Sequence, residues 1–111
     1  MLKKDNKLLK NKDFECVLKY GRSVPSHFFL LKYGKNTSLI NRFGFVISLN
    51  VSKKAVERNL LKRRMREIIR CHPELLAGGF DVVFLIRKQS LSLDFNKLEG
   101  EVLKTLKNII K

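Results

Sequence analysis

Residues 53–72 carry the longest helical pattern in the sequence, and Pro73 marks its end because proline cannot continue an α-helix. Ser52, just before this segment, is a residue type that caps helix N-termini. At about 100° per residue, the apolar side chains of the segment fall on one arc. That arc contains Leu61, Met65, Ile68 and His72, with Ile69 at its edge. The pattern predicts a long helix that packs one side against a core.

A stripe of positive charge lies beside this apolar arc. Lys53 to Arg70 holds eight of the chain's 24 lysines and arginines, against only Glu57 and Glu67. Helical spacing gathers in the stripe Asn59, Lys62, Arg63, Arg66 and Arg70, with Arg58 at its border. Like charges at i, i+4 destabilise an isolated helix, whereas ordinary solvated faces mix signs. A solvated face is the plain interpretation, but we favour a phosphate-binding surface.

The charge balance points to a polyanionic partner. The chain has 111 residues, 44% of them hydrophobic, and a net charge of +14, so one core of ordinary size must carry the excess charge on its surface. Nucleic acid is the first candidate partner and a membrane surface the second. No apolar run approaches the roughly 18 residues that span a bilayer. The first residues, MLKKDNKLLKNKDF, do not resemble a signal peptide. We therefore expect a cytoplasmic protein with no membrane partner.

The sequence predicts a short basic tail followed by one domain that begins with a helix. Residues 1–10 are rich in lysine and are expected to form a mobile basic tail, while residues 11–111 form a single RNA-binding domain. Asn11 or Asp13 can cap a first helix that stops at Gly21. Pro25 then lies in a short extended connection.

Three apolar segments predict the strands of one sheet. They are His27–Tyr33, Arg42–Leu49 and Phe80–Arg87, the last preceded by a turn at Gly78–Gly79. Gly44 marks a bulge or a close approach of another group. Asp94 or Ser92 caps a final helix that runs to the C-terminus. The order is a helix, two or three strands, the long helix, a strand and a final helix. It predicts an α+β (α/β sandwich) fold with one central sheet covered by helices on at least one face.

Alternation along the first strand divides its side chains between two faces. Phe28, Leu30 and Lys32 alternate with Phe29, Leu31 and Tyr33, and we expect the set with Lys32 to be the exposed one. The phenylalanines expected in the core are Phe43, Phe45, Phe80 and Phe84.

No arrangement of residues in the sequence is typical of a catalytic or metal centre. Cys16 and Cys71 have no CxxC spacing and are expected to be free, half-buried thiols. His27 and His72 are separated and have no neighbouring ligand set. Asp81, one acid inside an apolar strand, predicts a structural pair with an arginine or lysine. We therefore expect a binding protein with no catalytic residue and no metal held by the protein alone.

The segment A-V-E-R-N-L-L-K-R-R-M-R-E, residues 55–67, closely resembles the signature helix of the bacterial ribonuclease P protein subunit family, A-x-x-R-N-x-x-K-R-x-x-R-E. The matching residues are Ala55, Arg58, Asn59, Lys62, Arg63, Arg66 and Glu67. Further residues resemble the family's first helix and last strand: Leu8, Asp13, Phe14 and Gly21, then Gly79, Asp81 and Arg87. The resemblance covers nearly the whole chain.

This resemblance implies an RNA partner that performs the chemistry. The family is the protein partner of a catalytic RNA that removes the 5′ leader from precursor tRNA. Its fold is an αβββαβα sandwich with a left-handed βαβ crossover. The resemblance implies contact with the catalytic RNA at Arg58, Asn59, Lys62, Arg63 and Arg66, and contact with the leader at Phe14. It implies Mg²⁺ held mainly by RNA, and no requirement for a protein partner.

The chain departs from the family pattern at several positions. Leu60 replaces a common arginine, and Leu49 and Asn50 replace paired lysines for which Lys53 and Lys54 can substitute. In the leader cleft, Leu18 replaces an aromatic residue and Lys32 a tyrosine. The cleft is therefore expected to rely less on base stacking and more on charge.

Two other functions remain open for the chain, and a core role remains open for Phe14. Helical spacing alone favours Phe14 as a core residue, and only the resemblance assigns it to a stacking surface. A ribosomal or ribosome-assembly protein shares this composition. A DNA-binding protein could place the long helix in the major groove, although no helix-turn-helix partner precedes residues 53–72.

Overall fold

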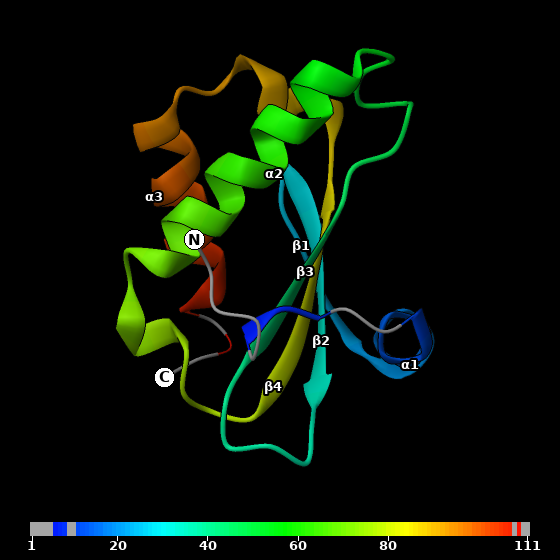
Figure 1. The fold of residues 1–111 in the computed structure, drawn as a ribbon, viewed down its shortest axis with the longest axis vertical. Coiled ribbons are helices and arrows are strands. Elements are labelled where there is room, and N and C mark those ends of the chain that lie inside the picture. The colour runs from blue at the N-terminus through cyan, green and yellow to red at the C-terminus, as the bar shows by residue number, and fades with distance from the viewer. Residues whose placement is uncertain (1–5, 9–10, 108, 110–111) are drawn as a thin grey trace.

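The computed structural model describes residues 6–8, 11–107 and 109, and Figure 1 shows their arrangement. The three helices are α1 (Asn11–Tyr20), α2 (Ala55–Arg70) and α3 (Phe95–Leu106). The four strands are β1 (Arg22–Pro25), β2 (Phe29–Lys35), β3 (Arg42–Val46) and β4 (Phe80–Ile86). Two short 3-10 helices are η2 (Pro73–Leu75) and η3 (Lys88–Ser92). The order αβββαβα is the expected one. No described helix is long and apolar enough to cross a membrane.

The strands form one mixed sheet in the order β1-β2-β4-β3. β2 is antiparallel to both β1 and β4, whereas β3 is parallel to β4. A parallel pair needs a crossover connection, and α2 supplies it between β3 and β4. The register opposes Arg42 to Asp81 and Gly44 to Val83. β3 is therefore an edge strand, and the last strand in the chain is a central one.

Helices cover both faces of this sheet (Figure 1). α2 and α3 pack on one face and bury the main core. Its largest fully buried side chains include Phe29, Phe43, Phe84, Met65 and Ile68. α1 covers the other face over a smaller apolar cluster formed by Leu8, Val17 and Val83. The α+β sandwich predicted from the sequence is confirmed.

The long helix is shorter than the expected span of 53–72. Ser52 does not cap it, because the Ser52 hydroxyl accepts from the backbone N–H of Lys54 at 3.1 Å and donates to Glu57 at 2.6 Å. These bonds build a turn before the helix, and Lys54 takes the N-cap position. At the other end, His72 has left the helical region because a residue preceding proline is disfavoured there.

The segment around Pro25 also differs from the prediction. The expected connection is strand β1, an edge strand, where a proline is tolerated since its missing N–H need not serve the ladder. The next strand begins at Phe29 rather than His27, and β3 ends at Val46 rather than Leu49. Phe28 lies before β2 and packs against the main core, so its expected exposure is wrong. Leu30 and Lys32 are half-buried, while Phe29 and Leu31 are fully buried.

Several local predictions are confirmed. Gly78 and Gly79 form a turn with φ of 149° and 80°, values that favour glycine. Asp94 caps α3 by accepting from the backbone N–H of Lys97 at 2.8 Å. The four core phenylalanines all belong to the main core, with Phe45 and Phe80 at its margin. Cys16 and Cys71 are free, but both are exposed rather than half-buried.

Part of the expected N-terminal tail packs against the domain. Asn6 is buried and donates to the carbonyl of Asn41 at 2.9 Å. Leu8 is buried in the smaller apolar cluster, and its backbone N–H donates to the carbonyl of Phe43 at 2.9 Å. The remainder of the expected tail, residues 1–5 and 9–10, lies outside the described residues. Asn6–Leu8 thus lie along the outer edge of β3.

Candidate nucleic-acid interface

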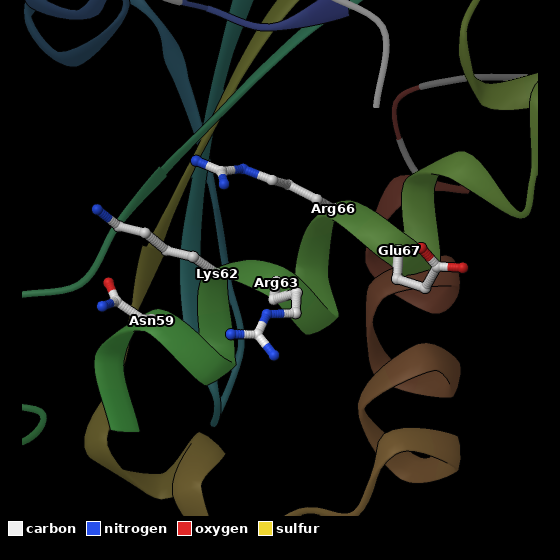
Figure 2. A pocket seen from close by; sticks show the side chains of 5 residues that line it. All are labelled: Asn59, Lys62, Arg63, Arg66 and Glu67. Atoms are coloured by element: carbon white, nitrogen blue, oxygen red, sulfur yellow. The ribbon is translucent and has the colours of Figure 1, made fainter. Parts of the chain in front are cut away.

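The basic stripe predicted from the sequence lies on one face of α2. Asn59, Lys62, Arg63, Arg66 and Glu67 line a hollow of about 480 Å³ (Figure 2). Figure 2 shows Lys62 and Arg66 extending in the same direction, while Arg63 and Glu67 point elsewhere. The opposite side of the helix buries Leu61, Met65, Ile68 and Ile69 in the core. The two predicted arcs are confirmed, except that His72 lies beyond the helix end.

The cations of the stripe differ in how the protein uses them. Arg58 donates from Nη1 to the carbonyl of Ser52 at 2.8 Å, so it supports the loop before α2. Arg70 pairs with Glu67, and this exposed hydrogen-bonded contact lowers the pKa of the Glu67 carboxyl. Within the part of the chain that the structure describes, none of the other three forms an ion pair with a carboxylate: Lys62, Arg63 and Arg66. The centre of the stripe therefore has donors available for an external anion.

A second, smaller groove lies at the outer edge of β3. Its volume is about 170 Å³, and its lining residues are Lys7, Leu8, Phe14, Phe43, Gly44, Phe45, Lys62 and Arg66. α1 and α2 cover opposite faces of the sheet, and residues of both helices line this groove because β3 is the edge strand. Lys62 and Arg66 belong to both hollows. The groove thus joins the charged stripe to the aromatic ring of Phe14.

Phe14 combines the two interpretations that the sequence left open. It is half-buried, and its ring packs against the apolar cluster between α1 and the sheet. The same residue lines the groove beside Lys62 and Arg66. A core contact and an accessible aromatic surface therefore coexist in one side chain.

The other two residues of the expected leader cleft do not line the groove: Leu18 lies one turn farther along α1, and Lys32 lies in β2. Leu18 packs at the margin of the smaller apolar cluster. The ammonium of Lys32 donates to the backbone carbonyl of Leu18 at 2.9 Å. Carbonyls in the last turn of a helix lack intrahelical partners, and a cation there stabilises the helix end. The charge of Lys32 thus serves α1.

The remaining basic candidates lie at the beginning of α2. Lys53 and Lys54 are exposed, and Lys53 lines a separate hollow with Asn50 and Lys88. Leu49 is 66% exposed and Leu60 is 39% exposed. The two leucines thus present apolar surface at positions where the resemblance leads one to expect charge.

Sequence reasoning missed Lys7 and Leu8 as part of the site because helical spacing carries no signal for a short segment beside an edge strand.

The sequence predicted that Asp81 pairs with an arginine or lysine, but it did not identify which one. Arg42 donates from Nε and Nη2 to Asp81 at 2.7 and 2.6 Å, and this hydrogen-bonded pair raises the pKa of the Arg42 guanidinium. The third nitrogen, Nη1, lies 3.5 Å from Asp13 of α1. This network ties α1 to the sheet beside the groove.

Among residues 6–8, 11–107 and 109, no three histidine, cysteine, aspartate or glutamate side chains gather in a way that could hold a metal ion. His72 lies 3.1 Å from Glu74 and 3.2 Å from Glu99, which links the end of α2 to α3. The features near the stripe are cations, an amide, an aromatic ring and one carboxylate, Glu67, which is paired with Arg70. Cations, amides and aromatic rings bind phosphates and unpaired bases.

The fold and this face define an RNA-binding α+β protein with a basic helix beside an aromatic groove. The family model for ribonuclease P matches residues 2–110. The ribonuclease P protein component of Desulforamulus reducens is 39% identical over 98 residues, which cover 88% of this chain and 86% of that one. The one from Clostridium botulinum (strain Langeland) is 35% identical over 94% of each chain.

A solved structure agrees with these relatives. The ribonuclease P protein from Thermotoga maritima superposes with a TM-score of 0.84 at 33% identity, covering 93% of this chain and 96% of that chain. The chain belongs to the ribonuclease P protein family, and its role is that of the RNA-binding protein component of this tRNA-processing ribonucleoprotein.

Proposed function

We propose that the α2 stripe binds the catalytic RNA and that the groove beside Phe14 binds the 5′ leader of precursor tRNA. The observation that carries this assignment is the convergence of Lys62 and Arg66, cations with no ion-pair partner among the described carboxylates, on a half-buried ring. Arg63 and Asn59 extend the donor surface away from the groove. The two ligands would thus meet at Lys62 and Arg66.

The chemistry of cleavage belongs to the RNA in this proposal. The stripe and groove supply hydrogen-bond donors, positive charge and one aromatic face, which are suited to binding rather than to proton transfer. Mg²⁺ would be held mainly by RNA phosphates, and the cations of the protein would neutralise other phosphates nearby. The assembly works in the cytoplasm and needs no second protein. Lys53, Lys54, Arg58 and Arg70 contribute charge at the margins of the RNA contact.

Reconstitution tests the function itself. The protein is added to a bacterial ribonuclease P RNA and precursor tRNA at low magnesium, and removal of the leader is followed. Restored cleavage is expected with the complex, and none with protein that is demonstrably free of RNA. Cleavage by the RNA-free protein would place catalysis in this chain and contradict the proposal.

Two substitutions separate the surfaces. Arg66→Ala and Phe14→Ala are compared for binding to catalytic RNA, precursor tRNA and mature tRNA, the latter two as complexes with the holoenzyme. Arg66→Ala is expected to weaken assembly with the catalytic RNA. Phe14→Ala is expected to leave assembly intact and to weaken precursor tRNA binding, while mature tRNA, which has no leader, is unaffected. Equal losses for all three ligands with Phe14→Ala would make Phe14 a core residue only.

A further inference from the structure

We infer that two residues of β3, Gly44 and Arg42, are positioning residues for the leader, because together they seat the Phe14 ring in the groove. This inference rests on the proposed function, since it concerns how the leader contact is held. Neither residue need touch RNA. Gly44 makes room for the ring on the surface of the sheet, and Arg42 holds the helix that carries it.

The space above Gly44 is filled by the Phe14 ring. A Cβ atom at position 44 would lie far inside van der Waals contact with Cε1 and Cζ of Phe14, and 3.3 Å from Cβ of Leu8. Backbone conformation does not explain this glycine, since only Gly78 and Gly79 have positive φ among the described glycines. The need at position 44 is therefore for space. The ring lies directly against the β3 backbone because no side chain stands between them.

Arg42 points to the same face of β3 as Gly44, since the two are two residues apart in a strand. Its guanidinium donates hydrogen bonds from two nitrogens to Asp81, and its third nitrogen contacts Asp13. Asp81 also accepts from the side-chain amide of Asn36 at 2.8 Å, which holds the carboxylate in place. Asp13 directly precedes Phe14 in α1. The first turn of α1 is thus anchored over β3 beside the position where Gly44 leaves space.

The position of the Phe14 ring against Gly44 determines where an unpaired base can stack relative to the cations. The Phe14 ring lines the groove with Lys7, Lys62 and Arg66. A ring lifted off β3 would keep its apolar surface but lose its place beside the ammonium and guanidinium groups. Stacking and phosphate contact by one nucleotide require both at once. A change at position 44 should therefore mimic loss of the ring without removing it.

The test is a double-mutant cycle in the reconstituted holoenzyme. Gly44→Ala, Phe14→Ala and the pair are measured for affinity toward precursor and mature tRNA. Gly34→Ala is the matched control, because it also lies in a strand and an added Cβ there meets nothing within 4 Å. Phe14→Ala is expected to lose about 5- to 150-fold in leader-dependent affinity, the range for one stacked base. Gly44→Ala should lose a large part of the same factor, Gly34→Ala none, and the pair no more than Phe14→Ala alone.

Additive losses in the pair, or Gly44→Ala behaving like Gly34→Ala, would overturn the role of Gly44 while leaving the leader contact of Phe14 standing. No leader-dependent loss with Phe14→Ala would instead overturn the proposed leader site, and the positioning role with it. Arg42→Lys keeps the charge but loses the two-pronged grip, and it is expected to weaken precursor binding more than mature tRNA binding. Equal weakening of both would make Arg42 structural only.

A folding defect in Gly44→Ala leaves the inference testable. In that case Gly44→Ala is combined with Phe14→Leu, whose smaller side chain makes room over β3. The pair is expected to melt at the same temperature as Phe14→Leu alone. If the double variant melts as low as Gly44→Ala alone, the added Cβ meets a group other than the Phe14 ring. That result would contradict the inference that the ring fills the space above Gly44.

Discussion

The basic stripe on α2 and the contacts that hold α1 and the Phe14 ring against the sheet place their side chains in opposite ways. The central cations of the stripe, Lys62, Arg63 and Arg66, have no ion-pair partner among the described carboxylates. Around α1, in contrast, Asp13 meets Arg42, the Leu18 carbonyl meets Lys32, and Phe14 rests on Gly44. Flexible cations suit phosphates, which accept donors from many directions. A stacking ring is useful only in one place and orientation, so the protein holds it through neighbouring contacts.

This difference predicts that damage to the α1 side costs stability, whereas damage to the stripe costs affinity. The largest expected effect is that of Asp81→Ala, which leaves the half-buried Arg42 without its main partner. Removing one member of a fully buried pair costs about 3–5 kcal/mol, and since Arg42 is partly solvated we expect about 2–3 kcal/mol. Urea unfolding measures the loss. Glu67→Ala, which breaks an exposed pair on α2, is the control, and a similar loss there would erase the contrast.

Affinity for the catalytic RNA is the property expected to respond to the stripe. If about five phosphates are neutralised, the log–log salt slope is about −3.5 to −4.5, and Arg66→Ala should reduce its magnitude by about 0.7–0.9. The loss in affinity should be about tenfold, the worth of one charge-assisted hydrogen bond of about 1.5 kcal/mol. Filter binding over a salt series measures both, and the unfolding midpoint should not change. An unchanged salt slope in Arg66→Ala would show that Arg66 does not contact a phosphate.

Lys32 sharpens the comparison because it is a cation on the α1 side. Its ammonium is held by the Leu18 carbonyl, so Lys32→Met should lower the free energy of unfolding by about 1 kcal/mol and leave the salt slope unaltered. Lys35→Met, at the exposed end of β2, is the matched control and should leave the free energy of unfolding as it is. A reduced slope with intact stability would show that Lys32 binds RNA directly.

The smallest expected effect concerns pH. Hydrogen bonding to Glu99, and secondarily to Glu74, raises the pKa of His72 above 6.5, because both carboxylates favour the imidazolium. A raised pKa means that this stabilisation is complete below about pH 6.5 and is lost as pH rises through the folded-state pKa. Denaturation midpoints at pH 5.5 and 8.5 should therefore show His72→Gln losing stability mainly at the lower pH. The exposed His27→Gln serves as control, and equal losses at both pH values would rule out the linkage.

The sequence predicted the elements with strong periodicity and missed those defined by contacts distant in the chain. The two arcs of α2 follow from side-chain spacing alone, and so does the turn at Gly78–Gly79. The residues of strand β1 did not identify it, because a proline at an edge strand looks like a connection, and a third strand before α2 was implied only by the resemblance. The true start of α2 depends on which group the Ser52 hydroxyl meets, and Glu57 is one of two partners.

The site was predictable in composition but not in assembly. Charge and spacing identified Lys62, Arg63 and Arg66, and Gly44 was predicted to mark either a bulge or a close approach of another group. That the ring of Phe14 fills the space above Gly44 is a contact between segments thirty residues apart. Periodicity describes one element at a time, so it does not report which elements meet at an edge strand. Lys7 was assigned to a tail for the same reason.

The central position of β4 bears on how the chain folds during its own synthesis. β2 and β3 do not pair with each other, and each pairs with β4, which leaves the ribosome after both of them and after α2. The sheet is therefore incomplete until residue 86 has emerged, and the basic helix is made before its core exists. Ribosomal RNA is the nearest polyanion to a nascent chain of this charge. Cotranslational folding of this protein must compete with that neighbour until its last strand is in place.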